Sequence, residues 1–154
     1  MIINKNLTVE PKEFEIVKYV IIKDNKEINI KKVMYKNSHI TLKEPDNVVL
    51  LKNKQLVKIQ KITTSSLKNT ASKIQIFGKN LEISSDEAFH YPTKASDLDI
   101  YVVKNKQKTK NAADDLERFF LSDIKCKMAF LSVFELPSDE KQVYAIPLLH
   151  NSDV

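Results

Sequence analysis

A polar break divides two apolar runs in the segment DNVVLLKNKQLVKIQKI, which spans residues 46–62. Both runs are rich in valine, leucine and isoleucine, and the break Lys52-Asn53-Lys54 between them is short. Such a pattern predicts two strands joined by a tight turn, which is a β-hairpin. Similar short runs recur along most of the 154 residues. The pattern therefore restricts the chain to a small and mostly β architecture.

Further strands are predicted from period-two alternation and from the turn residues between the apolar runs. Ile28 and Ile30 alternate with Asn29 and Lys31, and this alternation places the apolar side chains on one face of a strand. Polar pairs such as Lys36-Asn37 are typical of the turns between strands. The predicted strands are Glu15–Lys23, Glu27–Tyr35, His39–Leu42, Val48–Leu51, Gln55–Thr63, a strand within Ala71–Gly78, Leu98–Val103, Ile124–Phe134 and Val143–Leu149.

We expect these strands to form a mainly β fold, a small antiparallel β-barrel or sandwich, with one short helix near 111–121. Asn111 provides a helix cap, and Asp114 and Asp115 suit the positive end of the helix dipole. Gly78 is the only glycine, which predicts a left-handed or bulged backbone there. The expected organisation is a flexible leader (1–13), a single β-rich domain (14–150) and a tail (151–154).

The charge balance favours acidic partners. The formal net charge is +5, and Arg118 is the only arginine among the 25 basic residues. Lysine lacks the planar fork with which arginine reads base edges, so base-specific recognition is disfavoured. A single cysteine excludes an internal disulfide and suits a reducing compartment. Without an apolar leader or a membrane span, we expect an intracellular protein, nuclear or cytoplasmic, that binds no membrane.

The lysines provide the first candidate site. Four of them fall within residues 104–110, a stretch with no apolar side chain. Lys58 and Lys61 are three residues apart, so a regular strand would separate them, and either a bulge or the neighbouring loops are needed to form one patch. A general solvated basic surface is the alternative interpretation. The predicted partner-binding lysines are Lys52, Lys54, Lys58, Lys104, Lys106, Lys108 and Lys110.

Aromatic residues provide the second candidate site. Phe89 and Tyr91 lie in an irregular segment beside Asp86 and Glu87, and aromatic faces next to carboxylates can hold a methylated lysine by cation–π attraction. The alternative is a loop fastened to the domain by its aromatic side chains. The predicted aromatic pocket consists of Tyr35, Phe77, Phe89 and Tyr91.

Catalytic and cofactor motifs are weak in this sequence. One glycine cannot form a phosphate-binding loop. Cys126 alternates in phase with Ile124, Met128 and Phe130, which predicts a buried structural residue, whereas Lys125 and Lys127 are expected on the opposite face. We therefore predict no catalytic residue, no metal site and no cofactor. Asp97 and Asp99 are two residues apart and would share a strand face, an arrangement that leaves a metal-dependent nuclease as an alternative.

Several segments, in order, resemble a bromo-adjacent-homology (BAH) module. The family's entry region is similar to EINIKKVMYKNSHITLKEPDNVVLL (residues 27–51), and its following strands resemble LVKIQKI (56–62) and KIQIF (73–77). A later family segment is similar to either residues 97–103 or ERFFLS (117–122), and the family's cysteine-containing strand resembles IKCKM (124–128). The resemblance covers about residues 25–134 and implies a β module that mediates protein or chromatin association.

Three functions remain open from the sequence. The first is a non-enzymatic BAH-like binding module whose partner is an acidic protein or chromatin component. The second is an OB-type barrel that binds single-stranded DNA or RNA through lysines and exposed aromatic side chains. The third is the metal-dependent nuclease.

Overall fold

The computed structural model describes residues 14–22, 26–104, 116–134 and 141–148. These residues form ten strands and three short 3-10 helices, and no α-helix is present among them. The strands are β1 (Phe14–Ile22), β2 (Glu27–Tyr35), β3 (Ser38–Thr41), β4 (Val48–Leu51), β5 (Leu56–Thr64), β6 (Gln75–Leu81), β7 (Tyr101–Val103), β8 (Glu117–Phe120), β9 (Ile124–Phe134) and β10 (Lys141–Pro147). The 3-10 helices are η2 (Ala71–Lys73), η3 (Ala95–Leu98) and η4 (Leu121–Asp123).

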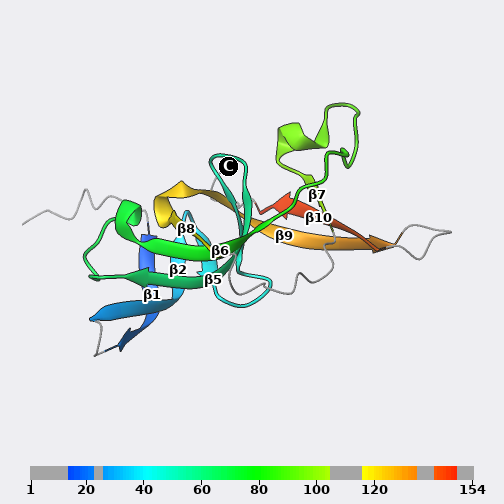
Figure 1. Ribbon diagram of the computed structural model, residues 1–154. Coiled ribbons are helices and arrows are strands. Elements are labelled where there is room, and N and C mark those ends of the chain that lie inside the picture. Colours follow the sequence, from blue (N-terminus) through cyan, green and yellow to red (C-terminus); the bar gives the residue numbers. More distant parts are fainter. Residues whose placement is uncertain (1–13, 23–25, 105–115, 135–140, 149–154) are drawn as a thin grey trace, which may run out of the picture.

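All strand pairs are antiparallel and belong to one bent sheet (Figure 1). The path of paired strands runs β1-β2-β5-β4-β9-β10-β7, β3 pairs with β2, and β6 lies between β5 and β8. The path is not closed into a barrel within the described residues. The mainly β prediction is therefore confirmed, and the architecture is an open sheet that curls on itself.

The predicted helix near 111–121 is wrong in the part of it that the structure describes. Glu117–Phe120 is strand β8, which pairs with β6, and a 3-10 turn follows at Leu121–Asp123. Phe119 packs against the buried core, so the chain gains more from sheet pairing and burial than from a local helix. Residues 111–115, which carry the cap and dipole signals, lie outside the described residues.

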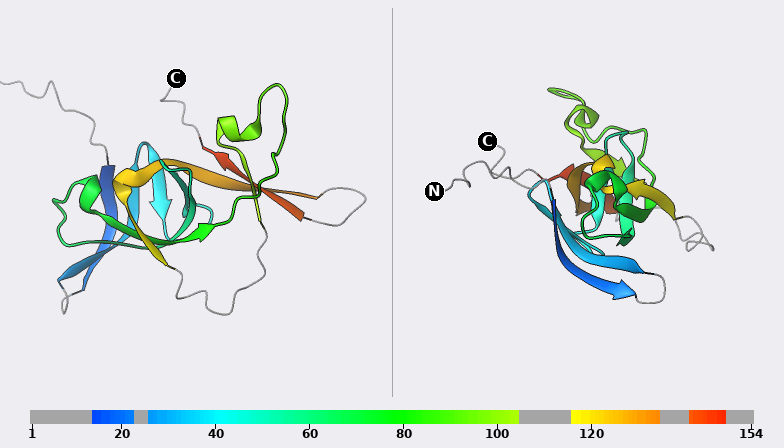
Figure 2. Two further views of the ribbon diagram at one scale, coloured as in Figure 1. Left: turned by 45° about the horizontal axis from the view of Figure 1, so that its top comes forward. Right: turned by 90° about the vertical axis from the view of Figure 1, so that its left-hand side faces the viewer.

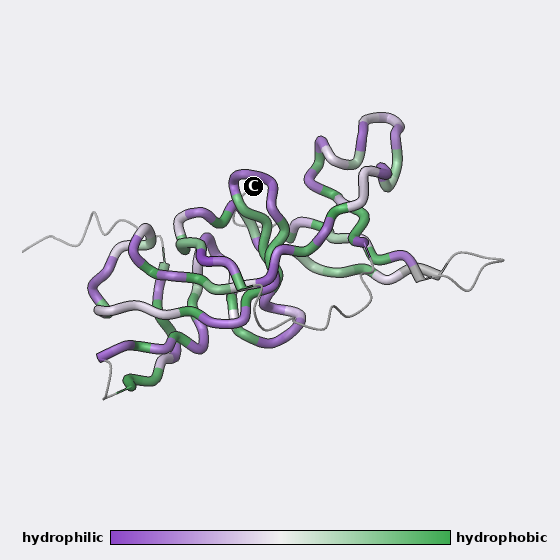
Figure 3. The backbone as a smooth tube through the Cα atoms, in the orientation of Figure 1, coloured by the Kyte–Doolittle hydropathy of each residue, from purple (hydrophilic) through white to green (hydrophobic). Residues whose placement is uncertain are grey.

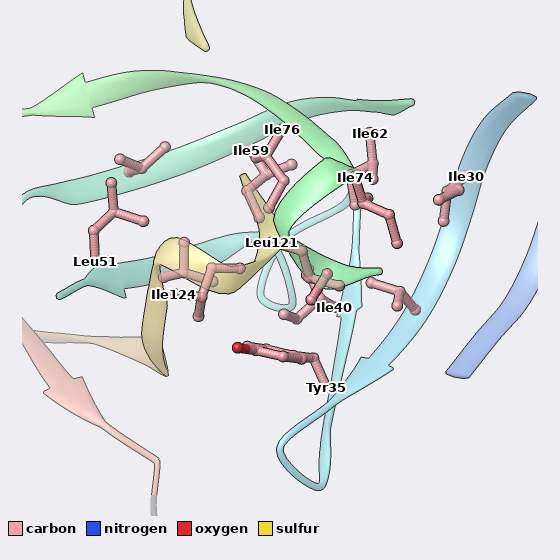
Figure 4. Packing of buried hydrophobic residues seen from close by; sticks show 14 residues of the cluster. Ile30, Tyr35, Ile40, Leu51, Ile59, Ile62, Ile74, Ile76, Leu121 and Ile124 are labelled. Carbon is pink, nitrogen blue, oxygen red and sulfur yellow. The ribbon is translucent and has the colours of Figure 1, made fainter. Parts of the chain in front are cut away.

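Two apolar clusters form the core. The larger one is enclosed by β2, β4, β5, β6 and the start of β9; its fully buried members include Ile59, Ile76 and Ile124 (Figure 4). Tyr35 lies at the margin of this cluster below Ile40. The smaller cluster lies between β4, β5, β9 and β10: Val48, Leu50, Leu56, Met128 and Ala145. One continuous strand, β9, therefore contributes to both clusters.

Gly78 is needed because two backbones approach closely, and not because of a left-handed conformation. No glycine among the described residues has a positive φ. A Cβ atom on Gly78 would lie 2.6 Å from the carbonyl oxygen of Lys58 on the neighbouring strand. The register of β5 against β6 shifts between Ile59 and Lys61, so the bulge lies on the strand facing Gly78. A bulge is one of the two alternatives that the spacing of Lys58 and Lys61 left open.

The predicted alternation along β9 holds only in part. Ile124 and Met128 are buried as expected, but Cys126 is half-buried and Phe130 is 38% exposed. Lys127, expected on the outer face, is 9% exposed. Cys126 and Phe130 each line a cavity, which leaves them partly exposed. Lys127 is buried where β9 passes from β4 to β10, and its ammonium group is bonded there to Asp46. No helix within the described ranges is long and apolar enough to span a membrane.

Candidate functional site

Four exposed lysines from three parts of the chain lie around the start of β9, which pairs with β4. Lys36, in the β2–β3 turn, donates from Nζ to the carbonyl oxygen of Ile124 at 3.1 Å. Lys52, in the β4–β5 turn, donates its backbone N–H to the carbonyl oxygen of Asp123 at 2.8 Å. Lys54 from that turn and Lys125 from β9 hydrogen-bond to one aspartate. We call Lys36, Lys52, Lys54 and Lys125 the lysine cluster.

Asp99 is the aspartate that the two lysines share. Its Oδ1 accepts a hydrogen bond from Nζ of Lys54 at 2.7 Å and from the hydroxyl of Tyr101 at 3.1 Å, and its Oδ2 accepts from Nζ of Lys125. The residue is 9% exposed, whereas the side chains of Lys54 and Lys125 are 54% and 42% exposed. One buried carboxylate therefore positions two solvated ammonium groups.

These contacts change the titration of all three kinds of group. Burial raises the pKa of Asp99, but the hydrogen bonds from Lys125, Lys54 and Tyr101 outweigh it, so the pKa lies below its ordinary value. The hydrogen bond to Asp99 raises the pKa of Lys125 to about 12. Burial, followed by the hydrogen bond to Asp99, raises the pKa of Tyr101 to about 12. Asp99 is therefore ionised and Lys125 is charged at neutral pH.

A cavity of about 550 Å³ opens beside the lysine cluster. The β2–β3 turn, the first half of β9, the end of β10 and residues 98–99 form its walls. Its volume is typical of a small-ligand or side-chain pocket. Its lining combines the lysines Lys36, Lys125 and Lys127 with the aromatic residue Tyr35 and a set of aliphatic residues: Ile40, Leu98, Ile124, Pro147 and Leu148. We call this the lysine-rimmed pocket.

Lys127 and Cys126 of β9 both line the pocket. Lys127 bonds from Nζ to the carboxylate of Asp46, whose side chain is 40% exposed. Cys126 donates its thiol to Sδ of Met128 at 3.7 Å, and burial raises the pKa of that thiol. A raised pKa lowers the thiolate fraction, which argues against a nucleophilic role for Cys126.

The structure divides the predicted lysine surface into separate parts. Lys52 and Lys54 belong to the lysine cluster, whereas Lys58 and Lys104 line a second cavity of about 440 Å³ with Glu44 and Glu82. Lys58 is bonded to Glu44, which lowers the pKa of that carboxyl. This second cavity therefore contains as many carboxylates as lysines. Lys106, Lys108 and Lys110 lie outside the described residues.

The predicted aromatic residues do not line one pocket. Tyr35 is 1% exposed and lines the lysine-rimmed pocket, to which Phe77, Phe89 and Tyr91 do not contribute. Phe77 lies on β6 with the ammonium of Lys61 at 5.9 Å from its ring centre. Tyr91 is 88% exposed. The geometry of these described residues gives no cage for a methylated lysine.

Asp97 and Asp99 do not share a strand face. Asp97 is in helix η3 and accepts a hydrogen bond from Thr93 at 3.1 Å, whereas Asp99 follows that helix with a left-handed backbone. Both oxygens of Asp99 are already bonded to lysines. The described part of the chain contains no group of three or more metal-ligating side chains. The arrangement of Asp97 and Asp99 therefore does not favour the nuclease alternative.

Sequence reasoning missed Lys36 and Lys125 as site residues. Lys125 lies beside the β4–β5 turn because β4 pairs with β9, and Lys36 reaches the carbonyl oxygen of Ile124 from the β2–β3 turn. Lysine spacing does not reveal either of these long-range contacts. The available signal was the alternation of lysines along IKCKM, which indicated an exposed face at Lys125.

Comparison with known proteins places the chain in a family. No curated protein and no solved structure matches the chain. A family model described as "Domain of unknown function (DUF8592)" matches residues 12–148, which includes every strand and the whole lysine-rimmed pocket. The chain therefore belongs to the DUF8592 family.

Proposed function

We propose that the chain is a non-enzymatic, BAH-like binding module that mediates protein or chromatin association by binding an acidic protein segment. The observation that carries the proposal is the lysine cluster beside the aliphatic pocket. The cluster has four lysines, and two of them, Lys54 and Lys125, share the one carboxylate of Asp99. The surface is therefore positive, and it attracts acidic partners over roughly a Debye length.

The pocket wall favours a peptide over a nucleic acid. Sequence-tolerant binding of single strands uses exposed aromatic faces on which bases stack. Tyr35, the aromatic residue of this pocket, is 1% exposed, and the ammonium of Lys36 lies 5.3 Å from its ring centre. An aliphatic wall instead suits an apolar side chain. We therefore expect a segment in which an apolar residue enters the pocket and neighbouring carboxylates face the lysines.

A direct binding measurement tests the proposal. The probe is a short fluorescent peptide with alternating glutamate and leucine, followed by anisotropy, and the comparison peptide has glutamine in place of glutamate. We expect the acidic peptide to bind more tightly, and its affinity to fall with added salt. Equal binding of both peptides, or tighter binding of a labelled single-stranded oligonucleotide, would contradict the proposal.

Variants locate the site. The triple substitution Lys36→Gln, Lys52→Gln, Lys125→Gln should lower the affinity for the acidic peptide roughly tenfold. The matched control, Lys73→Gln, removes an exposed lysine that lines a different cavity and should bind normally. Leu98→Asn tests the apolar wall without a change of charge, since Leu98 is 51% exposed and tolerates a polar side chain. Normal binding by both site variants would exclude this pocket.

A further inference from the structure

Strand β1 has an open edge and an unusual number of exposed apolar side chains. The β1–β2 ribbon stands away from the rest of the sheet (Figure 2), and its outer strand includes hydrophobic stretches (Figure 3). Phe14 and Ile16 pack against the core, but beyond them four apolar residues are 42–55% exposed: Val17, Tyr19, Val20 and Ile21. Within the described ranges β1 pairs with β2 alone, so its outer edge carries unpaired backbone groups.

The exposed residues lie on both faces of the ribbon. Tyr19 and Ile21 are opposite the core-facing residues Ile30 and Ile28 of β2, while Val20 is opposite Asn29. A cavity of about 550 Å³ continues the first face, with β1 on one side and residues 67–70 on the other. Soluble proteins normally protect edge strands with charges, prolines or bulges. Lys18 interrupts the apolar run of β1 between residues 16 and 22, and the register against β2 shifts on both sides of it, so the regular part of the apolar edge extends from Tyr19 to Ile22.

Lys18 adds a second observation, which concerns charge. In the register of the ribbon Lys18 is directly opposite Lys32. Neither ammonium group has a carboxylate within ion-pair distance in the described part of the chain. Like charges that face one another across a sheet are destabilising. A carboxylate supplied from outside would neutralise the pair.

We propose that the open edge of β1 receives an extended acidic segment of a partner protein as an additional strand. In this arrangement the partner's backbone pairs with β1, its apolar side chains cover Tyr19 and Ile21, and its carboxylates on the other face reach Lys18 and Lys32. Alternating apolar and acidic residues meet both requirements, because successive side chains of a strand point to opposite faces.

The same observations disfavour other occupants. A lipid bilayer cannot satisfy the unpaired backbone groups of a sheet edge. A nucleic acid would place phosphates against Val20 and Ile21. A second copy of the chain would bring two lysine pairs together without adding enough carboxylates. This surface is separate from the lysine-rimmed pocket, so the inference goes beyond the proposed association through that pocket.

Hydrogen exchange with a defined peptide tests the inference. The probe is a synthetic peptide of alternating valine and glutamate, and the control peptide has a central proline, which cannot pair as a strand. We expect the first peptide alone to saturate the protein and to slow amide exchange along β1. Unchanged exchange in β1 at saturation would overturn the inference. Dimerisation through β1 without peptide, or sedimentation with phosphatidylserine vesicles that depends on Tyr19 and Ile21, would overturn it too.

Two variants separate this surface from the pocket. Lys18→Glu with Lys32→Glu should weaken binding of the peptide at least tenfold. The charge-matched control, Lys43→Glu with Lys73→Glu, changes two exposed lysines outside the β1–β2 ribbon and should leave binding of the peptide little changed. The triple substitution in the lysine cluster should not alter the protection of β1 amides from exchange by the bound peptide. If that triple variant abolishes the protection while the Lys18→Glu, Lys32→Glu variant retains it, the peptide binds at the pocket and β1 is not a docking edge.

Discussion

Lys54 and Asp99 both have left-handed backbone conformations, with φ values of 73° and 59°, and Nζ of Lys54 donates to Oδ1 of Asp99 at 2.7 Å. Left-handed conformations are unfavourable for residues with a Cβ atom. Each residue closes a turn, Lys54 between β4 and β5 and Asp99 after η3. The ion pair therefore joins two strained turns, and one of its partners, Asp99, lines the lysine-rimmed pocket.

Replacing Lys54 separates backbone strain from the ion pair. Lys54→Ala keeps the strain and removes the ion pair, so it should lower the free energy of unfolding. Lys54→Gly removes both, and we expect it to be more stable than Lys54→Ala by about 1 kcal/mol. Urea unfolding of the two variants measures this difference. An alanine variant as stable as the glycine variant would show that the turn is not strained.

The lowered pKa of Asp99 predicts that the folded protein loses stability in acid. Its pKa in the folded protein is below the ordinary value of 3.8. Such a group stabilises the fold above the pKa of the unfolded chain, and this contribution is lost as the pH falls through the folded pKa. Asp99→Asn should therefore be less stable than the wild type at neutral pH and should approach it in acid. The control Asp97→Asn removes an exposed carboxylate and should keep the wild-type pH profile of urea unfolding.

Substitution of Gly78 should create a steric clash between strands β6 and β5. The added Cβ atom of Gly78→Ala would meet the backbone oxygen of Lys58 at 2.6 Å, and a strand backbone cannot move aside as a flexible side chain does. We expect a loss of about 1–3 kcal/mol in the free energy of unfolding. Thermal unfolding compared with Lys79→Ala, at the neighbouring position of β6, provides the measurement. A Gly78→Ala variant that matches the control would mean that β5 and β6 separate easily.

Substituting the two partners of the Lys127–Asp46 ion pair should have unequal effects on the stability of the fold. Asp46→Ala leaves the buried ammonium of Lys127 without its partner, whereas Lys127→Met leaves Asp46, which is 40% exposed, to be hydrated. Removing the partner of a buried charged donor costs about 1–3 kcal/mol. Asp46→Ala should therefore destabilise the fold more than Lys127→Met. Chemical unfolding of both proteins gives the order, and the reverse order would refute this interpretation.

The local sequence pattern was sufficient to predict most strands, because the alternation of side chains along a strand repeats every two residues and is visible within a short segment. The strands at Glu27–Tyr35, Val48–Leu51 and Ile124–Phe134 agree with the predicted bounds. The pattern failed at Glu117–Phe120, where pairing with β6 and burial of Phe119 override a helical preference. Local rules describe what a segment prefers alone, and this segment is decided by a strand about 40 residues earlier in the chain.

The candidate site was harder to predict than the fold. The turn pattern predicts Lys52 and Lys54, but the lysine cluster also needs Lys125, which depends on the register between β4 and β9, and Lys36, which depends on a contact with the backbone of Ile124. Lys58 shows the opposite case, because a carboxylate from the β3–β4 connection, Glu44, neutralises it. Charge counts along the sequence omit such partners.

Strand β9 pairs with β4 through its first half and with β10 through its second half, and the lysine-rimmed pocket lies where it changes partner. Ile124 and Lys125 line the pocket from the half of β9 that pairs with β4, whereas Pro147, paired with Met128, and Leu148 line it from the end of β10. The pocket is therefore built from both parts of the sheet, and the placement of its lining residues depends on two separate strand registers along one strand.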